Sequence, residues 1–127
     1  MSITTRIYYN KLIRDNIPDI IHSKHENCEV RRITDMQEFQ QELFKKIKEE
    51  ATSLSMTRTK EDFLEEYSDL MVVLETIIQQ LDITNDEVME VRTENLLRKG
   101  RYKQQNFLLW SDDLGYKSNE TPQGIPL

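Results

Sequence analysis

Two pairs of acidic residues carry the chemistry that this sequence offers. Glu66 and Asp69 lie three residues apart, a spacing that places both carboxylates on one face of a helix. The run 70–74 that follows is apolar on every side, and carboxylates set against such a run are costly to leave unpaired. The usual partner of clustered carboxylates is a hard divalent cation, and Mg²⁺ is commonly shared between carboxylates and a substrate phosphate. Together with Glu49 and Glu50 one helix earlier, the pattern indicates metal-assisted phosphate chemistry.

The same acidic residues have a plainer interpretation. Glu49 and Glu50 follow the lysine-rich run 45–48, and mixed charges of this kind are typical of a solvated helix face. Glu66 and Asp69 taken alone would also fit a helix surface. The functional interpretation therefore depends on the two pairs coming together in space.

Hydrophobic periodicity and capping signals predict the helices that must position these acids. Apolar residues recur at helical spacing over the two segments that hold the pairs, 35–55 and 60–81. A short helix is expected at 17–24, with Pro18 in its first turn, and a third long helix at 84–100. The three long helices have capping signals at their starts, Asp35 with Glu38, Thr59 with Asp62 and Thr84 with Glu87, and Gly100 ends the last. Residues 28–33 are expected to form a connector or a short strand.

Composition limits the protein class. With 127 residues, we expect one helical domain over 1–110, with the apolar stretch 106–110 docked on it, and a C-terminal tail over 111–127. Only 3 Gly and 3 Pro argue against a many-stranded sandwich. The net charge of −6 argues against a general nucleic-acid binder, and no apolar run reaches membrane length. Cys28 is the only cysteine, so we expect a reducing, cytoplasmic location.

Three segments together resemble a known family. Residues 11–18, KLIRDNIP, are similar to the KLVRDxIP opening of the phosphoribosyl-ATP pyrophosphohydrolase-like branch of the all-α nucleoside triphosphate pyrophosphatases, the MazG superfamily. The family pattern EExxE, a spacer and ExxD falls on 49–53 and 66–69, with twelve residues between them. The segment 98–102, RKGRY, resembles the family's KxGGF ending. The resemblance covers most of the chain, from about Tyr9 to Tyr102.

This resemblance implies an all-α bundle of three long helices and a short N-terminal helix. It implies Mg²⁺-dependent cleavage, with Mn²⁺ as an alternative metal, between the α and β phosphates of a nucleotide, among which non-standard nucleotides are candidates. The residues that it implies are metal ligands Glu50, Glu66 and Asp69, catalytic acids Glu49 and Glu50, and substrate-binding cations Lys11, Arg14 and Lys99. It further implies a homodimer or homotetramer.

Two positions depart from the family pattern. Ser53 replaces the third acid of EExxE, which removes one negative charge from the expected site, and Arg101 stands where a second glycine is common. Ser53 favours two alternatives: a degenerate module that binds nucleotide without turnover, and a structural helical partner protein. A side chain at Arg101 would either narrow the approach to the site or contact phosphate.

Three further interpretations remain open on the residues alone. The charged residues Lys11, Arg14 and Asp15 would also serve as a structural ion-pair network. His22, His25 and Cys28 have a spacing compatible with zinc, although no fourth ligand is apparent. The helix at 60–81 is apolar on more than one face, and such a helix is buried on all sides, which predicts a homo-oligomer.

Overall fold

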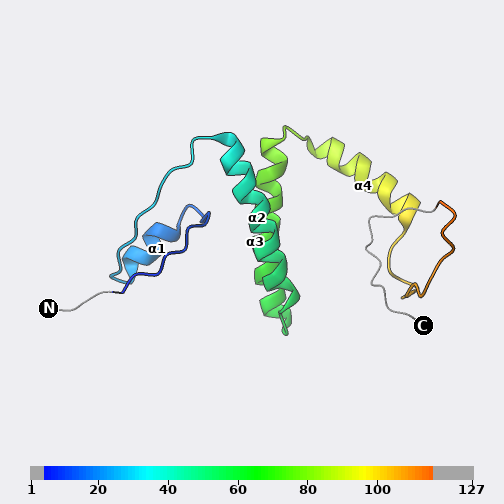
Figure 1. Cartoon of the computed structure of the whole chain (residues 1–127), viewed down its shortest axis with the longest axis horizontal. Coiled ribbons are helices and arrows are strands. Elements are labelled where there is room, and N and C mark those ends of the chain that lie inside the picture. Colours follow the sequence, from blue (N-terminus) through cyan, green and yellow to red (C-terminus); the bar gives the residue numbers. More distant parts are fainter. Residues whose placement is uncertain (1–4, 116–127) are drawn as a thin grey trace. The chain divides into compact units, whose positions relative to one another are not determined.

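The computed structural model describes residues 5–115, and every regular element in that range is a helix (Figure 1). The elements in chain order are α1 Ile17–Ser23, α2 Met36–Ser55, α3 Lys60–Gln80 and α4 Asn85–Lys99. The expected all-α class is therefore confirmed. No strand occurs in the described residues, and the 28–33 segment is an irregular connector. The end of the predicted tail, 116–127, lies outside the described residues.

The chain separates into two compact units, Met1–Glu87 and Val88–Leu127. The first holds α1, α2 and α3, and the second holds most of α4 and the segment that follows it. Each unit is described by itself below. The predicted domain boundary at residue 110 stays a prediction.

In the first unit, α2 and α3 run in opposite directions as a helical hairpin (Figure 1). Both helices start at the expected caps. The side chain of Asp35 accepts a hydrogen bond from the backbone N–H of Gln37 at 3.0 Å, and Thr59 Oγ1 accepts one from the N–H of Asp62 at 3.1 Å. Such caps satisfy N–H groups that have no partner within the helix.

One predicted capping box forms only in part. Glu38 does not reach back to the start of α2; its carboxylate receives two hydrogen bonds from the guanidinium of Arg31, at 3.1 and 2.7 Å. The Glu38 carboxylate is a charged acceptor in either arrangement, but the guanidinium offers a full positive charge and two parallel N–H donors, which favours the pair with Arg31.

The capping box of α4 forms completely. Thr84 Oγ1 accepts from the N–H of Glu87 at 3.1 Å, and the Glu87 carboxylate accepts from the N–H of Thr84 at 3.0 Å. Gly100 ends the helix with φ +75°, and its N–H donates to the carbonyl of Leu96 at 2.8 Å. A left-handed residue at this position favours glycine, as the sequence indicated.

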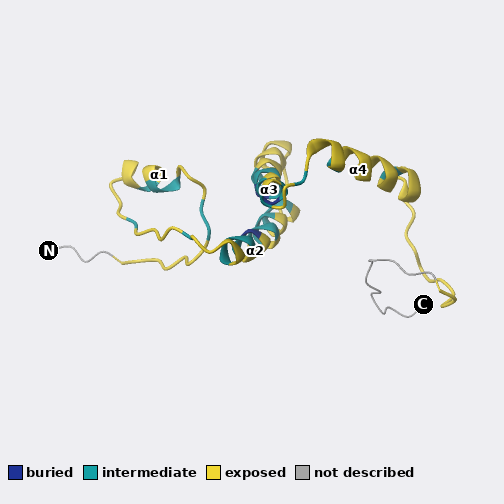
Figure 2. Cartoon of the chain, turned by 90° about the horizontal axis from the view of Figure 1, so that it is seen from above, coloured by how far each residue is buried: buried dark blue, intermediate teal, exposed yellow. Residues whose placement is uncertain are grey.

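The core of the hairpin is small. Among the described residues, only Leu43 of α2 and Val73 and Ile77 of α3 are buried (Figure 2). Leu12 and two further α2 residues, Phe39 and Ile47, pack against this cluster. The cluster fixes the distance between α2 and α3, and so it places the acidic residues of the two helices opposite each other. None of the described helices is both long and apolar enough to traverse a lipid bilayer.

Candidate metal site

Three carboxylates from α2 and α3 converge between the two helices. One oxygen each of Glu50, Glu66 and Asp69 lies within 4.8 Å of the other two. All three side chains are half-buried. Within residues 5–115, this is the one group of three or more Asp, Glu, His or Cys side chains close enough to share an ion. Glu50 of the first acidic pair therefore meets both acids of the second pair, and Glu49 is not a member of this group.

The spacing of these oxygens suits a small divalent cation. Opposite ligands of Mg²⁺ are separated by roughly 4.2 Å, twice the usual Mg–O distance, and adjacent ligands lie closer. The 4.8 Å limit exceeds that span by a few tenths of an ångström, which carboxylate side chains can close by small rotations. An all-oxygen donor set is also the one that Mg²⁺ and Mn²⁺ prefer.

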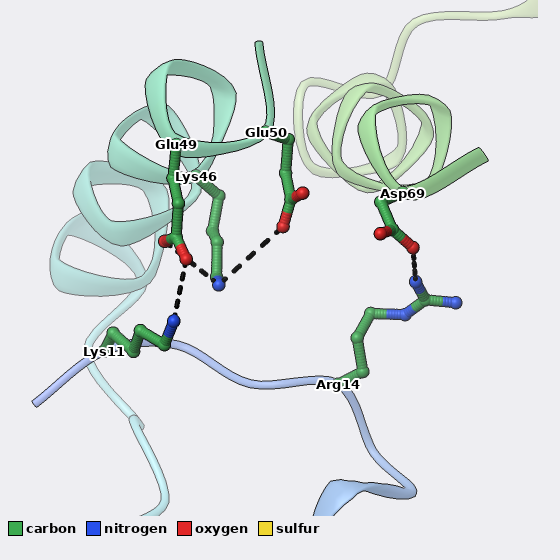
Figure 3. Close-up of polar contacts among 6 residues, drawn as sticks. All are labelled: Lys11, Arg14, Lys46, Glu49, Glu50 and Asp69. Carbon is green, nitrogen blue, oxygen red and sulfur yellow. Dashed lines mark hydrogen bonds and ion pairs between the residues drawn. The ribbon is translucent and has the colours of Figure 1, made fainter. Parts of the chain in front are cut away.

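Two lysines bind the α2 acids (Figure 3). Lys11 Nζ lies 2.7 Å from Glu49 Oε1, and Lys46 Nζ lies 3.2 Å from Glu49 Oε2 and 4.0 Å from Glu50 Oε1. The hydrogen bond from Lys11 is the largest cause that holds the pKa of Glu49 below its ordinary value. Glu49 therefore stays ionised and is a weak proton acceptor.

Lys46 was missed as a member of this cluster by the sequence analysis, which placed it on a solvated face. Its side chain is only 13% exposed. The signal was present in the spacing, since positions 49 and 50 lie three and four residues further along one helix and share its face.

Arg14 reaches the other helix of the cluster (Figure 3). Its Nη1 lies 3.5 Å from Asp69 Oδ1. Lys11 and Arg14 both belong to the irregular segment before α1, so this segment brings two cations to the acidic residues of α2 and α3. These contacts are those expected of an ion-pair network, and a phosphate-binding role requires the same cations to exchange a carboxylate for a phosphate.

Glu50 is the carboxyl group of this cluster whose pKa is raised. Burial raises its pKa above the ordinary value, and the negative charges of Asp69, Glu49 and Glu66 raise it further, against the opposing effect of Lys46. Burial costs the charged form, and like charges nearby add to that cost. A divalent cation bound between these carboxylates would offset the cost of burial and the repulsion between the negative charges, and it would lower the pKa of Glu50.

We expect ionised Glu50 to lower the stability of the metal-free fold, although the same carboxylate is the candidate metal ligand. Because its pKa in the folded state is raised, ionised Glu50 destabilises the fold once the pH rises through that pKa, and protonated Glu50 does not. Glu50→Gln is therefore expected to stabilise the metal-free fold at pH 7 by on the order of 0.5–1 kcal/mol. Denaturant unfolding in EDTA measures this difference, which should vanish as the pH falls to about 4.5.

Glu65→Gln is the matched control, because Glu65 precedes Glu66 on α3 and is exposed. It makes the same change of charge outside the cluster and should leave stability unchanged. Glu50→Gln that destabilises the protein at pH 7 in EDTA would show that the cluster is already neutralised.

The remaining candidate residues are not members of the group of three carboxylates. Ser53, one turn after Glu50 on α2, is half-buried. Lys99 belongs to the second unit, where it lines a separate pocket. Cys28 Sγ lies 3.8 Å from His22 Nε2, but within the described chain no third ligand joins them, so the zinc interpretation gains no support.

No family model, curated protein or solved structure matches this chain.

Proposed function

We propose that this protein is a Mg²⁺-dependent nucleoside triphosphate pyrophosphohydrolase that releases a nucleoside monophosphate and pyrophosphate. The observation that carries the proposal is the convergence of Glu50, Glu66 and Asp69 between α2 and α3. The order and spacing of the KLIRDNIP, EExx and ExxD segments, which resemble the MazG superfamily, add the reaction class.

In this proposal, Glu50, Glu66 and Asp69 hold the metal. When bound, Mg²⁺ supplies charge neutralisation at the phosphates and lowers the pKa of a coordinated water. Glu49 or Glu50 orients that water as general base in this proposal, and Glu49 is the one of the two that is not also a metal ligand. Glu49 orients Lys11 and Lys46 through its two ion pairs.

Lys11 and Arg14 bind the substrate phosphates in this proposal. Arg14 shares Asp69 with the metal, so a cation that takes the Asp69 carboxylate releases the guanidinium for a phosphate oxygen. Both side chains are substantially exposed and can reach a ligand without disturbing the core.

A pyrophosphate-release assay tests the proposal. Purified protein is incubated with a panel of standard and non-standard nucleoside triphosphates, once with Mg²⁺ and once with EDTA. Monophosphate and pyrophosphate in equal amounts, with Mg²⁺ alone, are the expected products. Nucleotide binding without turnover of any substrate would favour the alternative of a degenerate binding module, to which Ser53 points.

Ser53→Glu is expected to raise kcat/KM at limiting Mg²⁺, by roughly threefold to tenfold. Ser53 lies one turn after Glu50, so a carboxylate there adds negative charge on the same face of α2. The expected gain corresponds to a net electrostatic contribution of about 0.7–1.4 kcal/mol. The comparison is kcat/KM for wild type and variant over a Mg²⁺ titration, with Ser55→Glu, on an exposed position, as control. Equal values for all three proteins would show that the third acid is dispensable.

We further propose that the protein works as a homo-oligomer, a dimer in the simplest case. Three apolar side chains of α3 and that of its C-cap residue are between 46 and 51% exposed: Phe63, Leu64, Tyr67 and the C-cap Leu81. With three buried residues as its whole described core, the hairpin has too little buried apolar area to be stable without further burial. A second copy is the simplest partner that a two-fold interface supplies.

Light scattering tests the assembly. The expected mass at micromolar concentration is at least twice the 15.2 kDa of one chain. Leu64→Glu, which places a charge on the exposed face of α3, should shift the mass toward that of one chain. A wild-type mass of 15.2 kDa across the concentration range would contradict the proposal.

A further inference from the structure

Lys46 is a cation held between the two acids of α2 (Figure 3). Its Nζ donates a hydrogen bond to Glu49 Oε2 at 3.2 Å and lies 4.0 Å from Glu50 Oε1. The ammonium group has three N–H donors, so one lysine can serve both carboxylates at once. Lys46 therefore links Glu49, which lies outside the group of three carboxylates, to Glu50, which is a member of it.

The side chain of Lys46 is more deeply buried than that of any other cation in an ion pair within residues 5–115. It is 13% exposed, whereas the other paired lysines and arginines are between 40 and 73% exposed. Exposed ion pairs contribute little to stability, because water screens the charges and the side chains lose entropy. A lysine withdrawn from water also loses hydration, which its partners have to replace. The two carboxylates therefore fix the Lys46 ammonium more firmly than an exposed pair would.

The order of the residues along α2 argues against an ordinary helix-stabilising pair. A glutamate before a lysine at helical spacing is the favourable order, because it agrees with the helix dipole, and the reverse order contributes less. Lys45 has the favourable order, since it pairs with Glu42 at 2.9 Å. Lys46 has the reverse order, because both of its acids lie further along the helix. The stability of α2 alone thus does not explain the contacts of Lys46.

The two lysines on Glu49 differ in how freely they can move. Lys11 binds Oε1 from the irregular segment before α1. In the proposed function Lys11 binds a substrate phosphate, and it then has to leave Glu49. Lys46 belongs to the same helix as Glu49, three residues before it, so its contact with Oε2 does not depend on the irregular segment. Departure of Lys11 thus frees one oxygen of Glu49 and leaves the other bound.

A carboxylate with one bound and one free oxygen suits a group that orients water. The bound oxygen restricts rotation of the carboxylate, and the free oxygen accepts a hydrogen bond. We propose that Lys46 is a positioning residue, which holds Glu49 Oε2 while Glu49 Oε1 accepts a hydrogen bond from the attacking water. This inference rests on the proposed function, in which Glu49 or Glu50 orients that water, and it selects Glu49.

Lys46→Gln is expected to lower kcat for nucleotide cleavage by at least about tenfold and to change KM by less than about threefold. Glutamine keeps a hydrogen-bond donor and loses the charge that holds the Glu49 carboxylate. Lys45→Gln is the matched control, because it makes the same change one position earlier on α2, where the partner is Glu42. Its kcat should stay within about twofold of wild type. Equal kcat values for the two variants would overturn the proposal.

Metal affinity separates positioning from structural support. Mn²⁺ is titrated without nucleotide and followed by electron paramagnetic resonance, a readout that does not depend on turnover. Lys46→Gln removes a positive charge near Glu50, so this variant should bind Mn²⁺ at least as tightly as wild type. Mn²⁺ binding weakened by about threefold or more would show that Lys46 only supports the structure of the cluster, which would overturn the positioning role.

A second background tests whether Lys46 acts through Glu49. Glu49→Gln should lower kcat by about a hundredfold or more. Adding Lys46→Gln should then cost no more than about a further twofold, because no carboxylate remains at position 49 for Lys46 to hold. A further loss of about tenfold would show that Lys46 acts on the substrate without Glu49, and the proposal would be wrong.

Lys46→Arg decides the case in which Lys46→Gln does not fold, and circular dichroism checks the helical content of both. Arginine keeps the charge, but its guanidinium prefers two parallel bonds to one carboxylate, so kcat should still fall by about threefold or more. Wild-type kcat in whichever of the two variants folds would overturn the proposal. A wild type without turnover would refute the proposed function and this inference with it, whereas an active wild type that Lys46→Gln leaves unchanged would refute only the role of Lys46.

Discussion

Asp69→Asn is expected to lower kcat/KM for nucleotide cleavage by at least about a hundredfold. The amide keeps the shape of the carboxylate and removes its charge. The proposed metal thereby loses one of three carboxylates, and Arg14 loses its anionic partner. Steady-state kinetics at fixed Mg²⁺ measures the effect, and a Mg²⁺ titration followed by thermal unfolding measures metal affinity directly.

Glu65→Gln is the control for this change as well. It removes one carboxylate from an exposed position of α3, four residues before Asp69, and should keep kcat/KM within about twofold of wild type. If Asp69→Asn and Glu65→Gln behaved alike, the three converging acids would be a structural cluster and the catalytic account would be wrong.

Leu43→Ala is expected to lower the free energy of unfolding of the first unit strongly. Leu43 is the most buried side chain described, at 3% exposure, and it packs on Val73 and Ile77 across the hairpin. Truncation of a buried leucine to alanine costs about 2–5 kcal/mol, a large part of the 5–15 kcal/mol by which most domains are stable. Circular dichroism during urea unfolding measures the loss.

Leu97→Ala makes the same substitution on α4 at a side chain that is 84% exposed. Its expected effect is within about 0.5 kcal/mol. A Leu43→Ala protein as stable as Leu97→Ala would mean that the α2–α3 contact is not what holds the hairpin together.

Much of the fold could be predicted from local sequence signals. Thr59 and Thr84 cap α3 and α4 as expected, and Gly100 ends α4, because each of these effects depends on residues within one turn. Glu38 could not be predicted in the same way. Its partner Arg31 lies in a connector without regular structure, and no local rule places that guanidinium at the start of α2.

Part of the candidate site could likewise be predicted from helical spacing, and part could not. The shared face of Glu66 and Asp69 follows from helical spacing, and their meeting with Glu50 requires only that α2 and α3 pack as a hairpin. The ion pairs of Lys11 with Glu49 and of Arg14 with Asp69 join residues 38 and 55 positions apart. Such contacts depend on the path of an irregular segment, which periodicity does not encode.

The docking of 106–110 on the helical domain stays a prediction. Four apolar side chains of this stretch are between 63 and 85% exposed: Phe107, Leu108, Leu109 and Trp110. Apolar residues in sequence do not specify which surface covers them. The proposed homo-oligomer offers one such surface.

Metal-dependent catalysis at Glu50, Glu66 and Asp69 is tested most directly by pyrophosphate release from nucleoside triphosphates by wild type, Asp69→Asn and Glu65→Gln, each with Mg²⁺ and with EDTA. We expect equimolar monophosphate and pyrophosphate from wild type and Glu65→Gln with Mg²⁺, none above background in EDTA, and at least about a hundredfold slower release from Asp69→Asn. Turnover that persists in EDTA, or that Asp69→Asn leaves intact, would contradict metal-dependent catalysis at these three acids.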